Sequence, residues 1–428
     1  MDLIFRNRYK HIVDSIDQYP QENAWIRLSQ EAKMGIKYVC YAGSTGYADA
    51  SRGYVRSLYE VGVPVNIEVY QYYNGKTQLS VQDNVIAISL QNTHLDYDTV
   101  IIHTVPNTWS KIVEQERKHR PNCRIYGLTV WETDTVYPEW VDIIAKLDLT
   151  GLILPSEWNG HIFSKNHHMP PIYVCHHAIS LCQNRSEGKL ETVLYKGSPK
   201  TLKLLCIGTW TCRKGIDETV HAYLKTFTKH DDVILYLKTS DGKYSDKNSF
   251  ELLKRLHHIV KQYPAPALIQ LDTSLRSDDY MELLIDQSDV YISLCNSEGV
   301  GLGACYAASQ GKIVVMTGYG GQREYIPVAN WVDYKLGEVR VPPGFAHWIQ
   351  PPQKWAYPDL EHAVKILRNI YKNRQEFAKS TPQNRKFIEE HFSYRAIGEK
   401  LLGIVGMKPS YQSPECGLWR HRQGEKQI

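Results

Sequence analysis

The stretch from Ser297 to Gly321 joins an acidic residue, a glycine-rich turn, a run of small residues and an apolar segment. Glycines at 299, 301 and 303 follow Glu298 and remove side chains where a backbone must approach a ligand. Amides at a helix start carry partial positive charge, which suits a phosphate group. The pattern therefore predicts an anion-binding turn with the Glu298 carboxylate projecting into the same crevice.

A second set of polar residues lies between Gly208 and Gly215, in the sequence Gly-Thr-Trp-Thr-Cys-Arg-Lys-Gly. Gly208 ends an apolar run, and Arg213 and Lys214 come just before a predicted helix. Two cations beside free backbone amides suit a diphosphate leaving group, whose negative charge grows as its bond breaks. The alternative interpretation is a solvated Arg–Lys pair without a chemical role.

Strands and helices must alternate to position these residues. Apolar runs at 290–294 and 313–316 read as buried strands, and the segment between them has the length of a crossover helix. Such units build a parallel sheet, and ligands bind beyond the carboxyl ends of its strands. The fold class is therefore α/β.

The same reading extends along the chain. A strand at 35–41 runs into the glycine loop from Gly43 to Gly46 and then a helix with apolar residues at helical spacing. Further strands are predicted at 65–70, 84–89, 99–103, 124–130, 151–155, 202–208, 233–239 and 267–272. Further helices are predicted at 216–227, 249–263, 278–287, 359–377 and 382–404.

The stretch that begins at Glu298 resembles the signature of the family 4 retaining glycosyltransferases, Glu-Gly-Phe-Gly-Leu followed by a small-residue helix and a Gly-Gly turn. The residues in register are Glu298, Gly299, Gly301, Leu302, Ala307, Gly311, Val314, Gly320 and Gly321. The resemblance implies a GT-B fold, in which two Rossmann-like domains face each other across a cleft. It also implies transfer of a hexose from a nucleotide sugar, with retention of configuration.

The catalytic candidates are Glu298, Lys214, Arg213 and Glu132, of which Arg213 matches no family position and is included because it could reach the same phosphates from four residues beyond Thr209. Lys214 takes the place of the family's phosphate-binding Lys, and Glu298 would orient the donor sugar. The donor-binding set is Gly43, Gly46, Gly208, Thr209, Gly299, Val300, Gly301, Leu302, Tyr306, Gly320 and Gly321. Two positions depart from the family pattern, since Thr209 replaces an Arg and Tyr306 replaces the second Glu.

Many family members also hold a His at the end of a first-domain strand. This chain has Trp131-Glu132 there, so either Glu132 substitutes or the role is absent. His103 is the other candidate, expected to face the cleft; alternatively it caps its strand by bonding to the backbone. Glu324 matches a Glu common in the family and is expected to serve the conformation of its own loop. Glu399 and Lys400 are expected on a solvated helix face.

A length of 428 residues exceeds what one core normally supports, so two domains are expected. Residues 35–178 are predicted to form the acceptor domain and 201–378 the nucleotide-sugar donor domain, with a linker region at 179–200. An extension at 1–34 precedes them. A helix at 379–405 is expected to pack back on the first domain, before a polar tail at 406–428.

Composition narrows the range of partners. A formal net charge of +4 without a basic block gives no nucleic-acid surface. No apolar run approaches about 18 residues, and the first residues are charged, so a cytoplasmic protein without a transmembrane segment is expected. The nine cysteines lack Cys-x-x-Cys spacing and the histidine pairs lack ligand spacing, so neither disulfides nor a metal are expected. The nucleotide sugar is expected as a co-substrate and no cofactor is expected, while the acceptor is left open among a glycan, a lipid and a protein.

Two other functions stay open. Because Thr209, Tyr306 and the missing His alter three polar positions, the chain could be a degenerate GT-B protein that binds a sugar nucleotide or glycan without turnover. The glycine loops also suggest a nicotinamide oxidoreductase. That class requires an acidic residue about 20 positions beyond the first loop at a strand end, and none is suitably placed.

Overall fold

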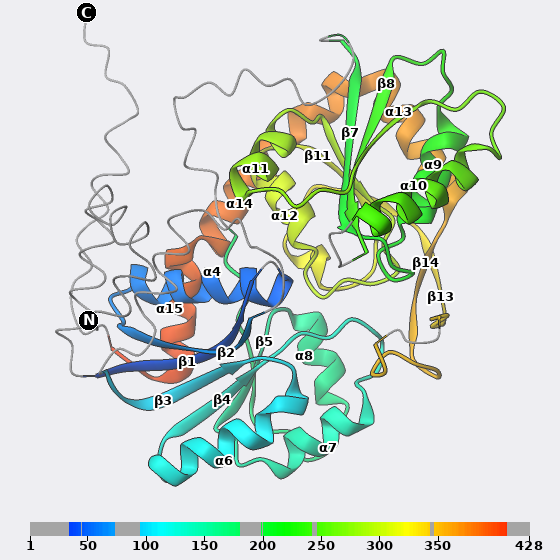
Figure 1. The fold of residues 1–428 in the computed structure, drawn as a ribbon. Coiled ribbons are helices and arrows are strands. Elements are labelled where there is room, and N and C mark those ends of the chain that lie inside the picture. Colours follow the sequence, from blue (N-terminus) through cyan, green and yellow to red (C-terminus); the bar gives the residue numbers. More distant parts are fainter. Residues whose placement is uncertain are drawn as a thin grey trace, which may run out of the picture.

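The computed structural model describes residues 34–43, 45–72, 95–179, 198, 200–241, 246–342 and 346–408. Two six-stranded parallel sheets organise the chain, each with helices packed on its faces (Figure 1). We call them the first unit and the second unit. The predicted strand at 84–89, residues 1–33, most of the linker region and most of the tail lie outside the described residues.

The first unit has the strand order β2-β1-β3-β4-β5-β6. Its apolar strands are buried on both faces, which is typical of a parallel sheet covered by helices. The strands are β1 (Met34–Ala42), β2 (Val65–Tyr72), β3 (Asp96–His103), β4 (Arg124–Leu128), β5 (Gly151–Leu154) and β6 (Ile172–Val174). The helices are α4 (Gly46–Glu60), α6 (Trp109–His119), α7 (Pro138–Lys146) and α8 (Glu157–Ser164), and η1 (Pro106–Thr108) is a short 3₁₀ turn.

The second unit has the order β12-β11-β10-β7-β8-β9. β8 and β9 follow β7 toward one edge of the sheet, whereas β11 and β12 follow β10 toward the opposite edge. Ligands of such sheets bind where the order reverses, here between β7 and β10. The strands are β7 (Leu202–Thr209), β8 (Val233–Ser240), β9 (Leu268–Asp272), β10 (Val290–Ser293), β11 (Ile313–Thr317) and β12 (Asn330–Val332). The helices are α9 (Ile216–Thr226), α10 (Asp246–Val260), α11 (Asp278–Asp286) and α12 (Leu302–Ser309), with a 3₁₀ turn η2 (Gly321–Glu324).

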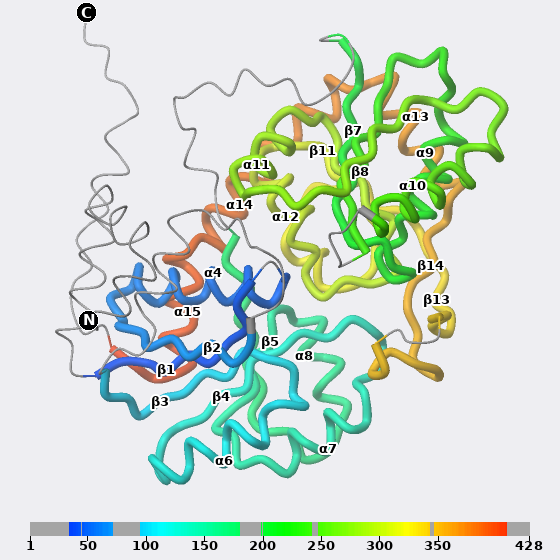
Figure 2. The backbone as a smooth tube through the Cα atoms, in the orientation of Figure 1, coloured from blue at the N-terminus to red at the C-terminus, as the bar shows by residue number. Residues whose placement is uncertain are grey.

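The C-terminal helices differ from the prediction. α13 (Leu360–Ser380) is longer than expected, and the single helix predicted at 382–404 is two helices, α14 (Pro382–Phe392) and α15 (Tyr394–Val405). Ser393 separates them with an extended backbone, and its side chain accepts a 3.3 Å hydrogen bond from the amide of Ala396. A serine N-cap of this kind starts a new helix. α15 then packs beside α4 of the first unit (Figure 2).

A two-stranded antiparallel hairpin, β13 (Tyr334–Glu338) and β14 (Lys354–Pro358), was not predicted. We call β13, β14 and the described residues between them the arm. Trp355 is fully buried in a small cluster made mainly of the arm's residues, against which Cys212 of the loop after β7 packs. The arm reaches the first unit, because Lys354 and Asp134 exchange hydrogen bonds of 2.6 and 3.1 Å, and the rings of Trp348 and Trp140 lie 6.1 Å apart.

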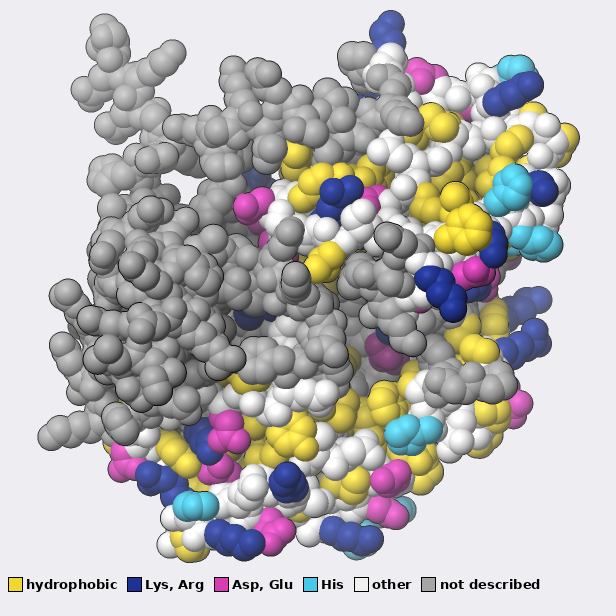
Figure 3. All heavy atoms as spheres, in the orientation of Figure 1, with side chains coloured by type: hydrophobic (Ala, Val, Ile, Leu, Met, Phe, Trp, Pro, Cys, Tyr) yellow, Lys and Arg dark blue, Asp and Glu magenta, His cyan; other side chains and the backbone are white. Residues whose placement is uncertain are grey.

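The surface of the second unit carries exposed apolar side chains over α10, in the upper right of Figure 3. Phe250 and Leu253 on this helix are 56% and 52% exposed. Isolated exposures of this size are ordinary for a folded protein. Among the described residues, no helix combines the length and the apolar content that a bilayer crossing requires.

Candidate active site

The loop after β7 is tied to the loop after β10, at the point where the strand order of the second unit reverses. The amide of Asn296 donates to the carbonyl of Arg213, and the side-chain amide of Asn296 donates to the carbonyl of Cys212, both at 2.8 Å. Arg213 Nη1 in turn donates to the carbonyl of Ser297 at 2.9 Å. These bonds fix Arg213 and Lys214 beside Glu298.

Four charged side chains meet there, and we call Glu132, Arg213, Lys214 and Glu298 the charged quartet. Arg213 Nη1 lies 3.2 Å from Glu298 Oε2 and 3.0 Å from Glu132 Oε1, and Lys214 Nζ donates to Glu298 Oε1. Glu298 is the most buried, with 9% of its side chain exposed. Glu132 comes from the loop after β4, so the quartet joins both units.

The two carboxylates of the quartet have opposite pKa shifts. Burial raises the pKa of Glu132, and the Glu298 charge raises it further against the opposing charges of Arg213 and Lys214. Burial also acts to raise the pKa of Glu298, but attraction and hydrogen bonds from Lys214 and Arg213 outweigh it, so that pKa is lowered. Glu298 is thus held as a carboxylate, while Glu132 is the group more readily protonated.

Glycines allow the loops of the two units to approach each other. A side-chain carbon on Gly299 would lie 2.1 Å from Cγ2 of Val130, which follows β4 in the first unit. Gly320 has φ +105°, and a side-chain carbon there would lie 2.3 Å from the carbonyl oxygen of Glu298. The Gly320-Gly321 turn therefore lies directly against the turn that carries Glu298, and the amide of Gly321 donates to the Glu298 carbonyl at 3.2 Å.

Tyr306 lies on α12, apart from the quartet. Its hydroxyl donates a 2.7 Å hydrogen bond to Oδ2 of Asp49, on the first turn of α4. Asp49 pairs with Arg52 at 3.1 Å, and Arg52 donates to the carbonyl of Gly43. The sequence predicted both Tyr306 and Gly43 as donor-binding residues, and the structure connects them across the two units through Asp49, which sequence reasoning missed.

The other predicted donor-binding residues lie near the loop ends. Thr209 ends β7, Gly208 packs against the Lys214 side chain, and Gly46 begins α4. Gly301 caps α12 and Leu302 begins it, while Val300 is buried in the core.

His103 lies inside the first unit and does not join the quartet. It is 1% exposed, and its Nδ1 lies 2.8 Å from the Tyr38 hydroxyl and 2.9 Å from Ser51 Oγ. Burial lowers its pKa well below the usual range, so the ring is neutral. The partners are side chains, whereas the alternative interpretation expected the backbone.

Glu324 does more than shape its own loop, which corrects the expectation. Its carboxylate accepts 2.8 Å hydrogen bonds from the amides of Glu157 and Trp158, at the start of α8 in the first unit. His176 Nε2 lies 3.0 Å from the same carboxylate. Burial acts to raise the pKa of Glu324, but the bonds from His176 and the two amides outweigh it and lower the pKa. Glu324 thus caps a helix of the other unit.

A buried lysine at the carboxyl end of β8 was also missed. Lys238 is 7% exposed, and its Nζ donates to the carbonyl of Ser274 at 2.7 Å. Burial lowers its pKa, opposed by the charge of Asp272, which pairs with Arg276 at 2.9 Å. The sequence signal for this site was a lysine at the end of the apolar run Leu-Tyr-Leu-Lys.

Within the described part of the chain no three His, Cys, Asp or Glu side chains are grouped as metal ligands would be.

Solved glycosyltransferases share this fold. HepE from Anabaena, solved with UDP and glucose, is 12% identical with a TM-score of 0.59, over 87% of this chain and 99% of that one. A glycosyltransferase from Rickettsia africae is 15% identical with a TM-score of 0.61, over 87% and 98%. WaaG, a glycosyltransferase involved in lipopolysaccharide biosynthesis, is 14% identical with a TM-score of 0.54, over 86% and 99%.

At these identities the likeness concerns the fold. The α/β class and the GT-B architecture predicted from the sequence are confirmed. No protein-family model and no curated protein matches the sequence.

Proposed function

We propose that this protein transfers a hexose from a nucleotide-sugar donor to an acceptor hydroxyl, with retention of configuration at the sugar. The observation that carries the proposal is the convergence of Arg213 and Lys214 with Glu298, at the reversal point of the second sheet. Glu132 faces them from the first unit. Two cations between facing loops suit a donor diphosphate.

The cations act on the leaving group. As the bond between the sugar carbon and the phosphate oxygen breaks, the electron pair leaves with the phosphate and positive charge develops on the sugar. Arg213 and Lys214 interact more strongly with the departing diphosphate, which gains one negative charge, than with the intact donor, and this lowers the barrier. Since these two side chains supply the positive charge, the proposal needs no metal ion.

Glu298 would orient the donor sugar by accepting hydrogen bonds from its hydroxyls. Its lowered pKa keeps it an acceptor at neutral pH. It also bonds to both cations, so donor binding requires Arg213 and Lys214 to share their hydrogen bonds between Glu298 and the diphosphate.

Glu132 is our candidate for the proton acceptor. With retention, the acceptor oxygen bonds to the sugar carbon from the face that the phosphate leaves, so the base must lie near the phosphate. Glu132 contacts Arg213, which we place on that phosphate. Its raised pKa suits a group that takes the proton of the acceptor hydroxyl and later releases it.

A second candidate function is binding without turnover. It is favoured by the charge balance of the quartet, in which two carboxylates already neutralise Arg213 and Lys214. The replacements at Thr209 and Tyr306 also favour binding without turnover.

One experiment tests both candidates. UDP-, GDP- and TDP-sugars are screened for thermal stabilisation, where a ligand at 100 times its dissociation constant adds about 2.7 kcal/mol. UDP-glucose is the first probe, because HepE was solved with UDP and glucose. Release of the nucleoside diphosphate then identifies an enzyme, and stabilisation without release identifies a binding protein. A chain that binds no nucleotide sugar contradicts transfer and leaves, of the second candidate, only the binding of a glycan. We also propose a cytoplasmic location, which fractionation of the source cells would test.

A further inference from the structure

A small hollow lies at the carboxyl ends of β11 and β12, beside the Gly320-Gly321 turn. It measures about 250 Å³ and is lined by Gly318, Arg323, Trp331, Val332, Asp333 and Tyr334. Pockets for drug-sized ligands measure roughly 300–1,000 Å³, so this hollow suits a smaller group such as one ring. None of the charged quartet lines it.

Aromatic rings form much of the hollow and its surroundings. Trp331 is half-buried and Tyr334 is 36% exposed. The Tyr334 ring lies 5.3 Å from the ring of Tyr319, which lies 5.4 Å from Trp158 of the first unit. The hollow is therefore next to the boundary between the two units.

Charged groups complete the lining. The Arg323 guanidinium lies 5.9 Å from the Trp331 ring centre and forms no ion pair with any described residue. The Asp333 side chain is 80% exposed, and its carboxylate lies 3.0 Å from His362 Nδ1, which accepts a 3.1 Å hydrogen bond from the Asp333 amide. The hollow thus offers apolar ring surface beside one donor group, which has no ion-pair partner among the described residues, and one exposed acceptor group.

This combination matches the surface of a pyranose. Such a ring has an apolar face of C–H groups, which packs on aromatic side chains, and a rim of hydroxyls that donate and accept hydrogen bonds. We propose that the hollow binds a sugar unit of the acceptor, so that the acceptor is a glycan; this inference rests on the proposed function. The donor hexose is the other possible source of a sugar ring. The lining comes wholly from the second unit, which the sequence predicted as the donor domain, but it contains no residue of the quartet and lies beside the boundary with the first unit, so we assign the hollow to the acceptor.

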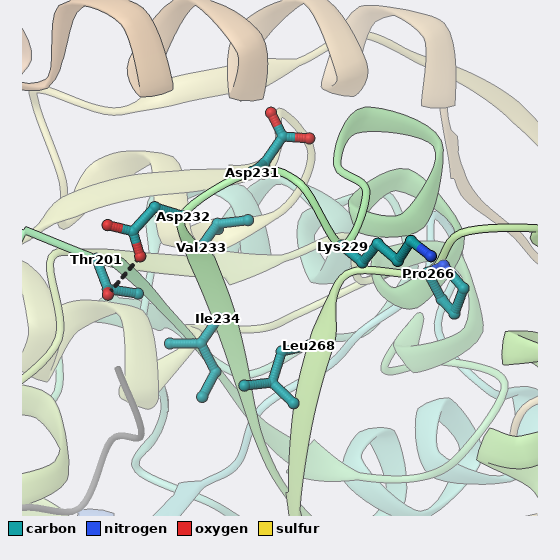
Figure 4. Close-up of a pocket in the computed structure, with 8 residues that line it drawn as sticks. All are labelled: Thr201, Lys229, Asp231, Asp232, Val233, Ile234, Pro266 and Leu268. Atoms are coloured by element: carbon teal, nitrogen blue, oxygen red, sulfur yellow. Dashed lines mark hydrogen bonds between the residues drawn. The ribbon is translucent and has the colours of Figure 1, made fainter. Parts of the chain in front are cut away.

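Another hollow among the described residues lacks these features. It measures about 340 Å³ and lies at the amino ends of β7, β8 and β9, at the edge of the sheet opposite the quartet (Figure 4). Its lining has no aromatic ring. Thr201 and Asp232 bond to each other at 2.6 Å, and Asp231 pairs with Arg368.

Calorimetry on the full chain tests the proposal without any nucleotide. The probes are linear trisaccharides of glucose, galactose, mannose or N-acetylglucosamine. We expect at least one to bind, and we expect Trp331→Ala and Tyr334→Ala each to weaken binding about tenfold, because each removes a ring that packs on the sugar. Trp331→Phe should keep more affinity than Trp331→Ala. Phe250→Ala is the matched control, since it truncates an exposed aromatic on α10.

Three results would overturn the inference: no trisaccharide binds, both alanine variants bind like the wild type, or Phe250→Ala weakens binding equally. Tyr334→Ala keeps the test valid if Trp331→Ala fails to fold. Repeating the titration with saturating nucleotide sugar separates the two sources. Unchanged affinity is expected for an acceptor site, and lost binding would assign the hollow to the donor hexose. Failure of the proposed function is distinct, because it appears as an absence of nucleotide-sugar binding.

Discussion

The hydroxyl of Tyr306 donates a 2.7 Å hydrogen bond to the carboxylate of Asp49, which joins helix α12 of one unit to helix α4 of the other. The resemblance places a carboxylate at position 306, whereas here a tyrosine stands there and the carboxylate comes from the facing unit. Burial raises the pKa of Tyr306, and the Asp49 charge raises it further, so the phenol keeps its proton and acts as the donor.

Tyr306→Phe should lower the free energy of unfolding by about 1.5 kcal/mol, the size expected for a hydrogen bond to a charged group. Asp49→Asn should cost a similar amount. The double variant should cost clearly less than the sum of the two, because both changes remove the same bond. Urea unfolding of the four proteins measures this coupling, and strictly additive effects would show that the bond contributes nothing.

Lys214→Ala should reduce turnover by roughly 10²- to 10³-fold, the size seen when one preorganised charge stabiliser is removed. Donor hydrolysis or transfer is measured on protein whose circular dichroism matches the wild type. Lys225→Ala is the control, because Lys225 is an exposed lysine of the same unit that pairs with Glu361. Equal turnover in Lys214→Ala and the control would refute the placement of Lys214 on the diphosphate.

Glu298→Gln should sharply reduce transfer, because it removes the charged acceptor for the sugar hydroxyls. It also removes one of the two carboxylates that neutralise Arg213 and Lys214. Affinity for the free nucleoside diphosphate should therefore be kept or increased, as measured by calorimetry. Much weaker diphosphate binding would mean that Glu298 itself contacts the nucleotide. Glu361→Gln, at an exposed position, is the control.

Glu324 should make stability depend on pH. Its pKa in the folded protein is lowered from the ordinary value of 4.5, so folding favours its charged form. The resulting stabilisation is complete above about pH 4.5 and is lost as the pH falls through the lowered pKa. Relative to Glu324→Gln, we expect the wild type to be more stable by about 1 kcal/mol near neutral pH. The difference should shrink in acid, and a constant difference across the range would contradict this.

Much of the fold could be predicted from apolar runs. Strands of a buried parallel sheet are apolar on both faces, so the predicted runs at 233–239 and 290–294 match β8 and β10 within a residue. The same reasoning placed Arg213, Lys214 and Glu298 at strand ends, and topology brings strand ends of one sheet to one edge.

The remainder depends on contacts between distant residues. Nothing near Asp49 indicates that Tyr306, 257 positions away, is its partner. The arm has a proline-rich sequence in which apolar and polar residues alternate only in short pieces, and the burial of Trp355, mainly among residues of the arm, could not be read from it. Ser393 is of a residue type that favours an N-cap, but apolar residues at helical spacing on both sides of it led to the prediction of a single helix.

The arm has a consequence for how substrates enter and leave. In Figure 1, α14 and α15 connect the units on the left, whereas β13 and β14 lie on the right. The units are thus joined at two opposite margins as well as around the quartet, and the right-hand contacts include the Asp134–Lys354 bonds, the Trp140–Trp348 pair and the Tyr137–His347 rings 5.9 Å apart. The arm therefore limits how far the two units can separate when substrates enter and leave.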